Sequence, residues 1–270
     1  MTTAPIAQPA PPPSAKDFYA RALHNMRSIQ QPAFATYHVH VSVSGATFVV
    51  NRSPKGPAFV GFAVGHSKPS PPDFHAAYRD ADGLTGVETP QGWGTVRSPM
   101  FDPTWTGVSD WMRYGFDGRP ESTGTPAPRA TPSPKEPPVI VTVSAMGVAY
   151  YNVTDEGAAT CANGDAGHRV HLIARRDPQA HPLTDAVIDM RTQQLCGVRF
   201  GFRQSGPLSA SGVIDLDLAA IDGTMLVTRE RAQFNVHLLA IPLKPIVAEM
   251  RYGDFAFPDT VPPDDFPHAK

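Results

Sequence analysis

Residues 167–258 alternate between apolar and polar side chains with little interruption, and this alternation limits the fold more than any other feature of the sequence. Strict alternation with a period of two is typical of half-buried antiparallel strands. It is clearest over residues 194–204 (QLCGVRFGFRQ), and it continues through residues 168–174, 213–218, 225–236 and 247–257. The block is therefore predicted to form a meander with one solvent-facing and one buried face.

The first hundred residues add helical and strand signals to this meander. Residues 14–29 are predicted to form a helix, because their apolar side chains recur at helical spacing. Ser14 can cap its N-terminus, and Asp17, three positions later, is in the capping-box position. Residues 34–44 alternate like a strand, and residues 47–51 are expected to return from it as a hairpin. A second short helix is expected after Asp102, with Pro103 in its first turn. The fold class predicted from these patterns is mainly β with two short helices.

Proline is concentrated in particular segments rather than spread evenly through the chain, which has 30 prolines in 270 residues. Residues 1–13 are predicted to be a disordered tail, and residues 118–138 a mobile Pro-rich insertion. Residues 14–257 are expected to form a single β-rich domain, followed by a polar tail at 258–270. Residues 1–13 resemble the flexible spacer that follows a removed signal peptide or lipid-anchor sequence. The alternative is a cytoplasmic protein with a disordered N-terminus.

The balance of charge excludes some classes of partner. Lys and Arg number 23 and Asp and Glu 25, which gives a formal net charge of −2. A non-specific nucleic-acid binder needs a concentrated basic surface, so nucleic acid is not expected as a partner. No apolar run is long enough for a transmembrane helix.

Cys161 and Cys196 are the two cysteines of the chain. An even count in a chain of exported character favours a disulfide between them, and two buried free thiols are the alternative. A zinc site is disfavoured because the pair lacks the C-x-x-C spacing.

Motifs for catalysis are missing from the sequence. It has no G-x-S-x-G nucleophile elbow and no glycine-rich phosphate loop. Asp215 and Asp217 are expected on one face of a strand, which suits exposure to solvent better than the two carboxylates of a glycoside hydrolase, which face each other across a cleft. The strongest chemical alternative is a metal site assembled from two strands that would carry His38, His40, His168 and His171. We expect no catalytic residue, no cofactor and no bound metal.

Four stretches of the chain together resemble the bacterial outer-membrane lipoprotein carrier (Lol-type) family. They are the helix at residues 18–29, the strand at residues 37–44, the segment at residues 172–196 (LIARRDPQAHPLTDAVIDMRTQQLC) with a turn at 189–192, and the final Tyr-Gly-Asp-Phe at 252–255. The resemblance implies a curved antiparallel sheet, an incomplete barrel, whose concave face is covered by the two helices and encloses an apolar cavity.

Such a cavity would hold acyl chains of a lipid or an acylated protein by apolar burial alone. The residues expected near it are Trp93, Trp105, Val108, Met112, Phe200 and Phe202. The resemblance therefore implies a monomeric, non-enzymatic carrier or sensor, exported to the periplasm or lipid-anchored in the outer envelope, with a further envelope protein as a second partner. The alternatives are an exported protein-protein interaction module and a metal-dependent envelope enzyme.

Overall fold

The computed structural model describes residues 14–52, 58–63, 69–81, 83–96, 101–105, 107–108, 146–178, 181–204, 208–238 and 241–266. Within them, α1 runs over Ala15–Arg27, and short 3-10 turns lie at Val148–Tyr150 (η3) and Pro263–Asp265 (η4). The strands are β1 (Phe34–Ser44), β2 (Thr47–Arg52), β3 (Ala58–Ala63), β4 (Asp73–Arg79), β5 (Leu84–Thr89), β6 (Gly92–Val96), β7 (Tyr151–Thr160), β8 (Ala166–Ala174), β9 (Leu183–Asp189), β10 (Leu195–Gln204), β11 (Leu208–Ile221), β12 (Thr224–Leu238), β13 (Ile241–Pro242) and β14 (Ile246–Ala256).

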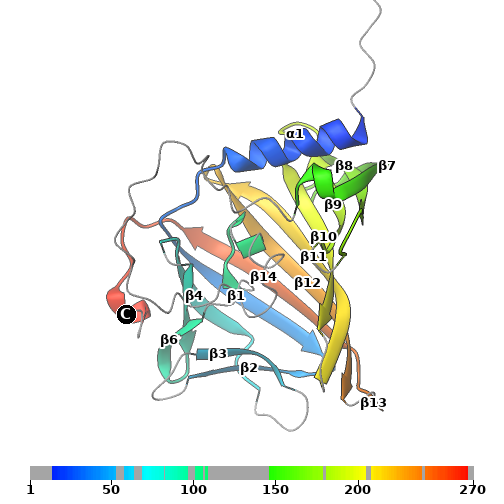
Figure 1. The fold of residues 1–270 in the computed structure, drawn as a ribbon. Helices are drawn as coiled ribbons and strands as arrows, with labels where there is room; N and C mark the ends of the chain where they lie inside the picture. Colours follow the sequence, from blue (N-terminus) through cyan, green and yellow to red (C-terminus); the bar gives the residue numbers. More distant parts are fainter. Residues whose placement is uncertain are drawn as a thin grey trace, which may run out of the picture.

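Twelve of these strands form one antiparallel sheet, which confirms a mainly β fold (Figure 1). Its order is β6-β5-β4-β1-β14-β12-β11-β10-β9-β8-β7, with β13 paired to β12. Two meanders thus lie side by side, one from each half of the chain, and they meet where β1 pairs with β14. The outermost strands, β6 and β7, are not paired with each other, so the sheet does not close into a barrel.

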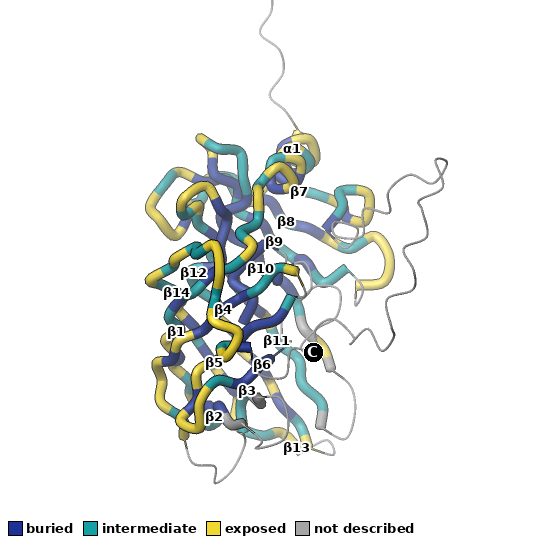
Figure 2. Tube along the Cα trace, turned by 90° about the vertical axis from the view of Figure 1, so that its left-hand side faces the viewer, coloured by how far each residue is buried: buried dark blue, intermediate teal, exposed yellow. Residues whose placement is uncertain are grey.

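Along the central strands, alternate residues face a common core, as the sequence pattern predicts. In β1 the buried side chains are Ala35, Tyr37, Val39 and Val41, and the pattern is carried across the pairing into β14 and β12. Buried positions run along the strands, and exposed ones gather in the turns (Figure 2). We call the side that bears this core the inner face and the opposite side the outer face.

The helix α1 lies across one end of the strands and contacts β7 and β10 (Figure 1). Its N-terminus is capped as predicted, because the Ser14 side chain accepts a hydrogen bond from the Asp17 backbone N–H at 3.2 Å. The buried side chains of its apolar stripe are Phe18, Tyr19, Ala22, Leu23 and Met26. The Tyr19 hydroxyl donates to the Met146 carbonyl at 2.9 Å, which ties the helix to the segment before β7.

The hairpin formed by β2 and β3 lies over the inner face of the sheet, where a second helix was expected. β2 pairs with β3 and not with β1, so the predicted hairpin of residues 34–44 with 47–51 is wrong. Both edges of β1 are occupied, by β14 and by β4, and Gly45 turns the chain away with a φ of 81°. Phe48 of β2 then stacks on Phe74 of β4 at 5.9 Å between ring centroids, which places the hairpin over the inner face.

Within the described residues α1 is the one named α-helix, and most of the second predicted helix, from residue 109 onward, lies outside the described residues. The segment after Asp102 begins a helical turn, in which the Val108 N–H donates to the Thr104 carbonyl at 3.4 Å. Asp102 caps it as expected: its Oδ1 accepts from the Thr104 N–H at 2.8 Å. Thr104 also forms an isolated antiparallel bridge with Leu226, so the start of this segment adds to the edge of β12.

Cys161 and Cys196 form a disulfide, as expected, with their Cα atoms 5.6 Å apart. It joins the turn after β7 to the start of β10. The predicted turn at residues 189–192 is also present, because Asp189 Oδ1 accepts from the Arg191 and Thr192 backbone N–H groups at 2.7 and 2.9 Å. These two features fix the same end of the sheet.

Residues 258–266, predicted as the start of a polar tail, pack against the other end of the sheet. Phe266 is buried with Ala77 and Leu84, and the Arg79 guanidinium lies 4.7 Å from the centre of its ring. The predicted tail at 1–13 and the predicted insertion at 118–138 lie outside the described residues.

Candidate functional site

The side chains predicted to line a cavity fall into three groups in the structure. Trp105, Val108 and Phe200 are buried in one continuous core on the inner face. Trp93 of β6 is half-buried in a second cluster with Ala77, Leu84 and Phe266. Met112 lies outside the described residues, as does the side chain of Phe202, whose backbone belongs to β10.

An apolar pocket opens where β9 is shorter than the strands on either side of it. β9 begins at Leu183, whereas β8 and β10 continue past that level, and the Gly201 N–H donates to the Pro182 carbonyl at 2.8 Å. The resulting notch has a volume of about 450 Å³. Its lining comprises His171, Leu172, Ile173, Ala174, Pro178, His181, Pro182, Leu183, Thr184, Gly201 and Arg203.

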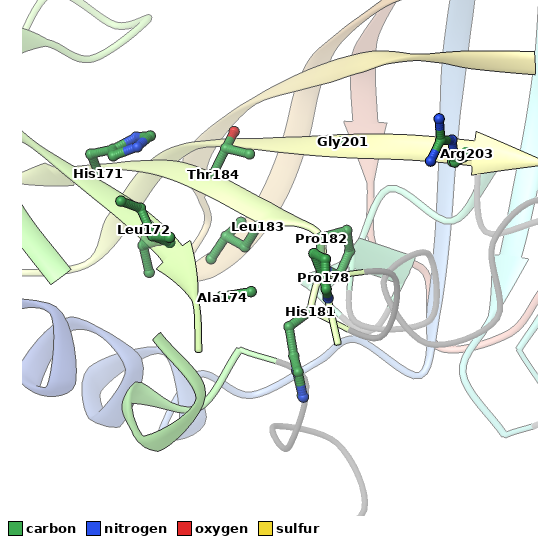
Figure 3. A pocket seen from close by; sticks show the side chains of 11 residues that line it. His171, Leu172, Ala174, Pro178, His181, Pro182, Leu183, Thr184, Gly201 and Arg203 are labelled. Atoms are coloured by element: carbon green, nitrogen blue, oxygen red, sulfur yellow. The ribbon is translucent and has the colours of Figure 1, made fainter. Parts of the chain in front are cut away.

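The inner wall of this pocket is shared with the core. Leu172 and Leu183 are both buried members of the main core, and Phe200 lies directly opposite Leu183 in the β9–β10 pairing. Figure 3 shows Leu172, Ala174 and Leu183 together between the strand ends, with Pro178 and Pro182 on the connection beside them. One of the side chains predicted from the sequence, Phe200, is therefore the cross-strand neighbour of a residue that lines the pocket.

Polar groups are confined to the rim of the pocket. Arg203 is exposed at the far end of β10, and His171 lies 3.2 Å from Asp185 between Nδ1 and Oδ1. The ring of His181 stacks on Tyr150 with 4.3 Å between centroids, and so closes one side. An apolar interior with a few polar groups at the entrance is typical of sites for amphipathic small molecules.

A buried carboxyl group interrupts the inner face in the middle of the sheet. Glu230 of β12 is 2% exposed, and its neighbours across the strands are Met250 and Leu216. The Tyr252 hydroxyl donates to Glu230 Oε2 at a long 3.4 Å, and Oε1 has no hydrogen-bond partner among the described residues. Burial raises the pKa of Glu230 to about 8, so the side chain is mostly neutral at pH 7.

The outer face carries a ladder of ion pairs across four strands. Arg199 binds Asp215 at 2.6 Å, and Arg229 forms an ion pair with Asp217. Glu249 accepts from Arg231 at 3.2 Å and from Arg251 at 2.6 Å, and the hydrogen bond from Arg251 lowers its pKa. The two aspartates thus lie on a solvated face, as predicted, each neutralised by an arginine.

The histidine pairs that might have formed a metal site are far apart. His38 and His40 lie on β1, and His168 and His171 on β8, with five strands of the sheet between them. His168 instead contacts Asp155 at 3.0 Å, between Nε2 and Oδ1. The proposed set of three imidazoles from these strands is therefore wrong, because the meander places β14 and not β8 beside β1.

Two further features escaped the sequence reasoning. Glu230 shares the parity of the buried residues Ala232, Phe234 and Val236, so the alternation itself could have marked it as an inward carboxyl. The pocket depends on the different lengths of three neighbouring strands, and no residue pattern in the sequence signals that.

An open antiparallel sheet with an apolar inner face and a small apolar pocket defines the class of this protein. Comparison with protein-family models gives no match, and comparison with curated proteins gives none either. Among solved structures, the chain is similar to a DUF1329 family protein from Desulfovibrio piger, at 12% identity and a TM-score of 0.35, covering 94% of this chain and 97% of that one.

A second similar structure is a domain provisionally described as an outer membrane lipoprotein-sorting protein, from Vibrio parahaemolyticus. The identity is 9% and the TM-score 0.36, with 93% of this chain and 97% of that chain covered. The chain is thus similar, at low sequence identity, to a structure described in the same terms as the family that the sequence resembles. Within the described residues, no helix has the length and apolar character needed to cross a membrane.

Proposed function

We propose that this protein binds acyl chains of a lipid or of a lipidated protein, without chemical conversion, as a carrier or sensor in the cell envelope. The observation that carries the proposal is the apolar pocket of about 450 Å³ whose inner wall, Leu172 and Leu183, is continuous with the core. Its volume lies in the range of about 300 to 1,000 Å³ that small-molecule sites occupy.

Burial of methylene groups supplies the binding energy in this proposal. Each CH₂ removed from water contributes about 0.8 kcal/mol, so a few methylenes in the notch suffice for a measurable affinity. Arg203 at the rim offers a guanidinium to an anionic headgroup, with which it can form two parallel hydrogen bonds. A ligand with a long acyl chain and an acidic head fits this arrangement best.

A deeper extension of the site toward the inner face would involve the side chains proposed from the sequence. Phe200 pairs with Leu183 across the strands, and Trp105 and Val108 belong to the same core. Trp93 belongs to the second cluster, with Phe266. Envelope localisation is supported by the Cys161–Cys196 disulfide, because such bonds persist in oxidising compartments.

A glycine substitution can fill the pocket without disturbing the sheet. A Cβ atom added at Gly201 would meet its nearest neighbour, the Pro182 carbonyl oxygen, at 3.9 Å, so Gly201→Phe should extend into the notch. Gly253 on β14 also has free space around a Cβ atom, and Gly253→Phe makes the same chemical change three strands away.

The assay is displacement of a fluorescent long-chain fatty acid, with native mass spectrometry of the protein purified from a lipid-containing bacterial host. We expect Gly201→Phe to weaken binding of the fatty acid at least about tenfold and to remove any co-purified acyl species. Gly253→Phe should behave like the wild type. Equal affinity for wild type and Gly201→Phe, or no saturable binding by the wild type, would overturn the proposal.

A further inference from the structure

Two imidazole rings converge on the outer face of the sheet, on the opposite side from the core. His38 of β1 and His75 of β4 are directly opposite each other in the strand pairing. Their Nε2 atoms lie 2.5 Å apart, and the ring centroids 3.6 Å apart. Both strands are paired on both sides in the sheet, so the backbone holds the two rings in place.

The ring orientation of His38 is fixed from behind by a carboxylate. Its Nδ1 lies 2.9 Å from Asp254 Oδ2, a contact that suits an Nδ1–H donor. In the neutral imidazole the proton at Nδ1 leaves a lone pair at Nε2, which points at His75. A carboxylate that orients an imidazole from its far nitrogen is the usual outer-shell partner of a metal-binding histidine.

The backbone is distorted to bring this carboxylate into position. Asp254 has a φ of 52°, in the left-handed region, which aspartate adopts more readily than most residues other than glycine. It lies within an irregularity in the pairing of β1 with β14, because Thr36 pairs with Ala256 and His38 with Gly253. Irregularities of this kind redirect side chains.

Space and further polar groups lie next to the two rings. His40 and Asp73 form the next cross-strand pair along β1 and β4, with 2.6 Å between Nδ1 and Oδ1. A hollow of about 240 Å³, lined in part by Asp73, His75 and Glu88, opens beside the second ring. Ligands from solvent can therefore reach an ion held between the two imidazoles.

We propose that His38 and His75 bind a divalent transition-metal ion, with Cu²⁺ bound most tightly. Neutral imidazoles suit Cu²⁺, Ni²⁺ and Zn²⁺, and Cu²⁺ leads the series for nitrogen ligands. A small rotation of the two side chains brings both Nε2 atoms to about 2.0 Å from one ion. In the described part of the chain no group of three His, Cys, Asp or Glu side chains forms a metal site, so the site offers two protein nitrogens and solvent ligands.

The test is titration of the tag-free, full-length protein with Cu²⁺, followed by calorimetry and by electron paramagnetic resonance. The wild type should bind one ion with two nitrogen ligands from histidine. His75→Gln should weaken binding at least about tenfold, because one imidazole and the chelate are lost. Asp254→Gly should weaken it by about 10- to 100-fold through the loss of the outer-shell partner, and glycine suits the positive φ.

His24→Gln is the matched control, since His24 is an exposed histidine on α1. It should leave both affinity and spectrum unchanged. Saturating Cu²⁺ should also raise the midpoint of thermal unfolding of the wild type but not of His75→Gln, because binding to the folded state stabilises it. No saturable site in the wild type, or an affinity that His75→Gln does not change, would refute the proposal. It is independent of acyl-chain binding, so either can fail alone.

Discussion

Replacement of Glu230 by glutamine should remove a pH dependence of stability that the buried carboxyl imposes on the fold. Burial raises the pKa of Glu230 from 4.5 to about 8, whereas an unfolded chain keeps the ordinary value. Between these pH values the folded protein holds one proton more than the unfolded chain. Stability therefore falls as the pH rises through this window, and the loss is complete above the folded-state pKa.

The expected magnitude follows from this pKa difference. The slope approaches about 1.4 kcal/mol per pH unit, and the wild type should lose about 3 to 4 kcal/mol between pH 5 and pH 8 from this group. Glu230→Gln cannot ionise, and it keeps an amide where the neutral carboxyl lay. The variant should therefore be close to the wild type at pH 5 and several kcal/mol more stable at pH 8.

Urea unfolding followed by tryptophan fluorescence at several pH values from 5 to 8 measures this difference. Other titrating groups change both proteins alike, so the difference between wild type and Glu230→Gln isolates Glu230. Glu88→Gln, at an exposed carboxylate of β5, serves as control and should follow the wild type. A difference between wild type and Glu230→Gln that stays constant from pH 5 to pH 8 would show that Glu230 is not buried as described.

Three further predictions concern the stability of the sheet. Cys161→Ser with Cys196→Ser should lower the free energy of unfolding by about 3 to 4 kcal/mol, and reductant should then have no further effect in a denaturation curve. Asp189→Ala should cost about 2 kcal/mol in the same assay because it removes the acceptor of two backbone N–H groups, and Asp189→Asn should cost less. Gly164→Ala should lower the free energy of unfolding by roughly 1 kcal/mol, and Gly45→Ala by clearly more. Both glycines have positive φ, but only at Gly45 would the new Cβ atom meet the Pro245 carbonyl oxygen, at 1.9 Å. Equal losses for the two glycine variants would contradict this account.

The parts of the fold that could be predicted from sequence are those set by neighbouring residues. Alternation places the strands of the C-terminal meander, Ser14 marks the start of α1, and the turn at Asp189 follows from its side chain. The partners of β1 could not be found this way, because they depend on which distant strands reach its two edges.

The candidate sites show the same division. The parity of Phe200 in its strand predicts that it is buried, which it is, whereas its role near a ligand stays a prediction. His75 was missed, since its place opposite His38 depends on the register between β1 and β4. Glu230 could have been found by its parity in β12, but a polar residue inside a long alternation is readily assigned to the wet face.

The pairing of β1 with β14 also bears on how the chain reaches its native state. One of these strands is near the start of the chain and the other near its end, so the backbone must close a very long loop before the two meanders share a sheet. Contacts so distant in sequence slow folding. Until the last strand emerges from the ribosome, one edge of β1 and one of β12 stay open to other chains. A protein truncated before residue 246 should accordingly aggregate rather than accumulate as a soluble fragment.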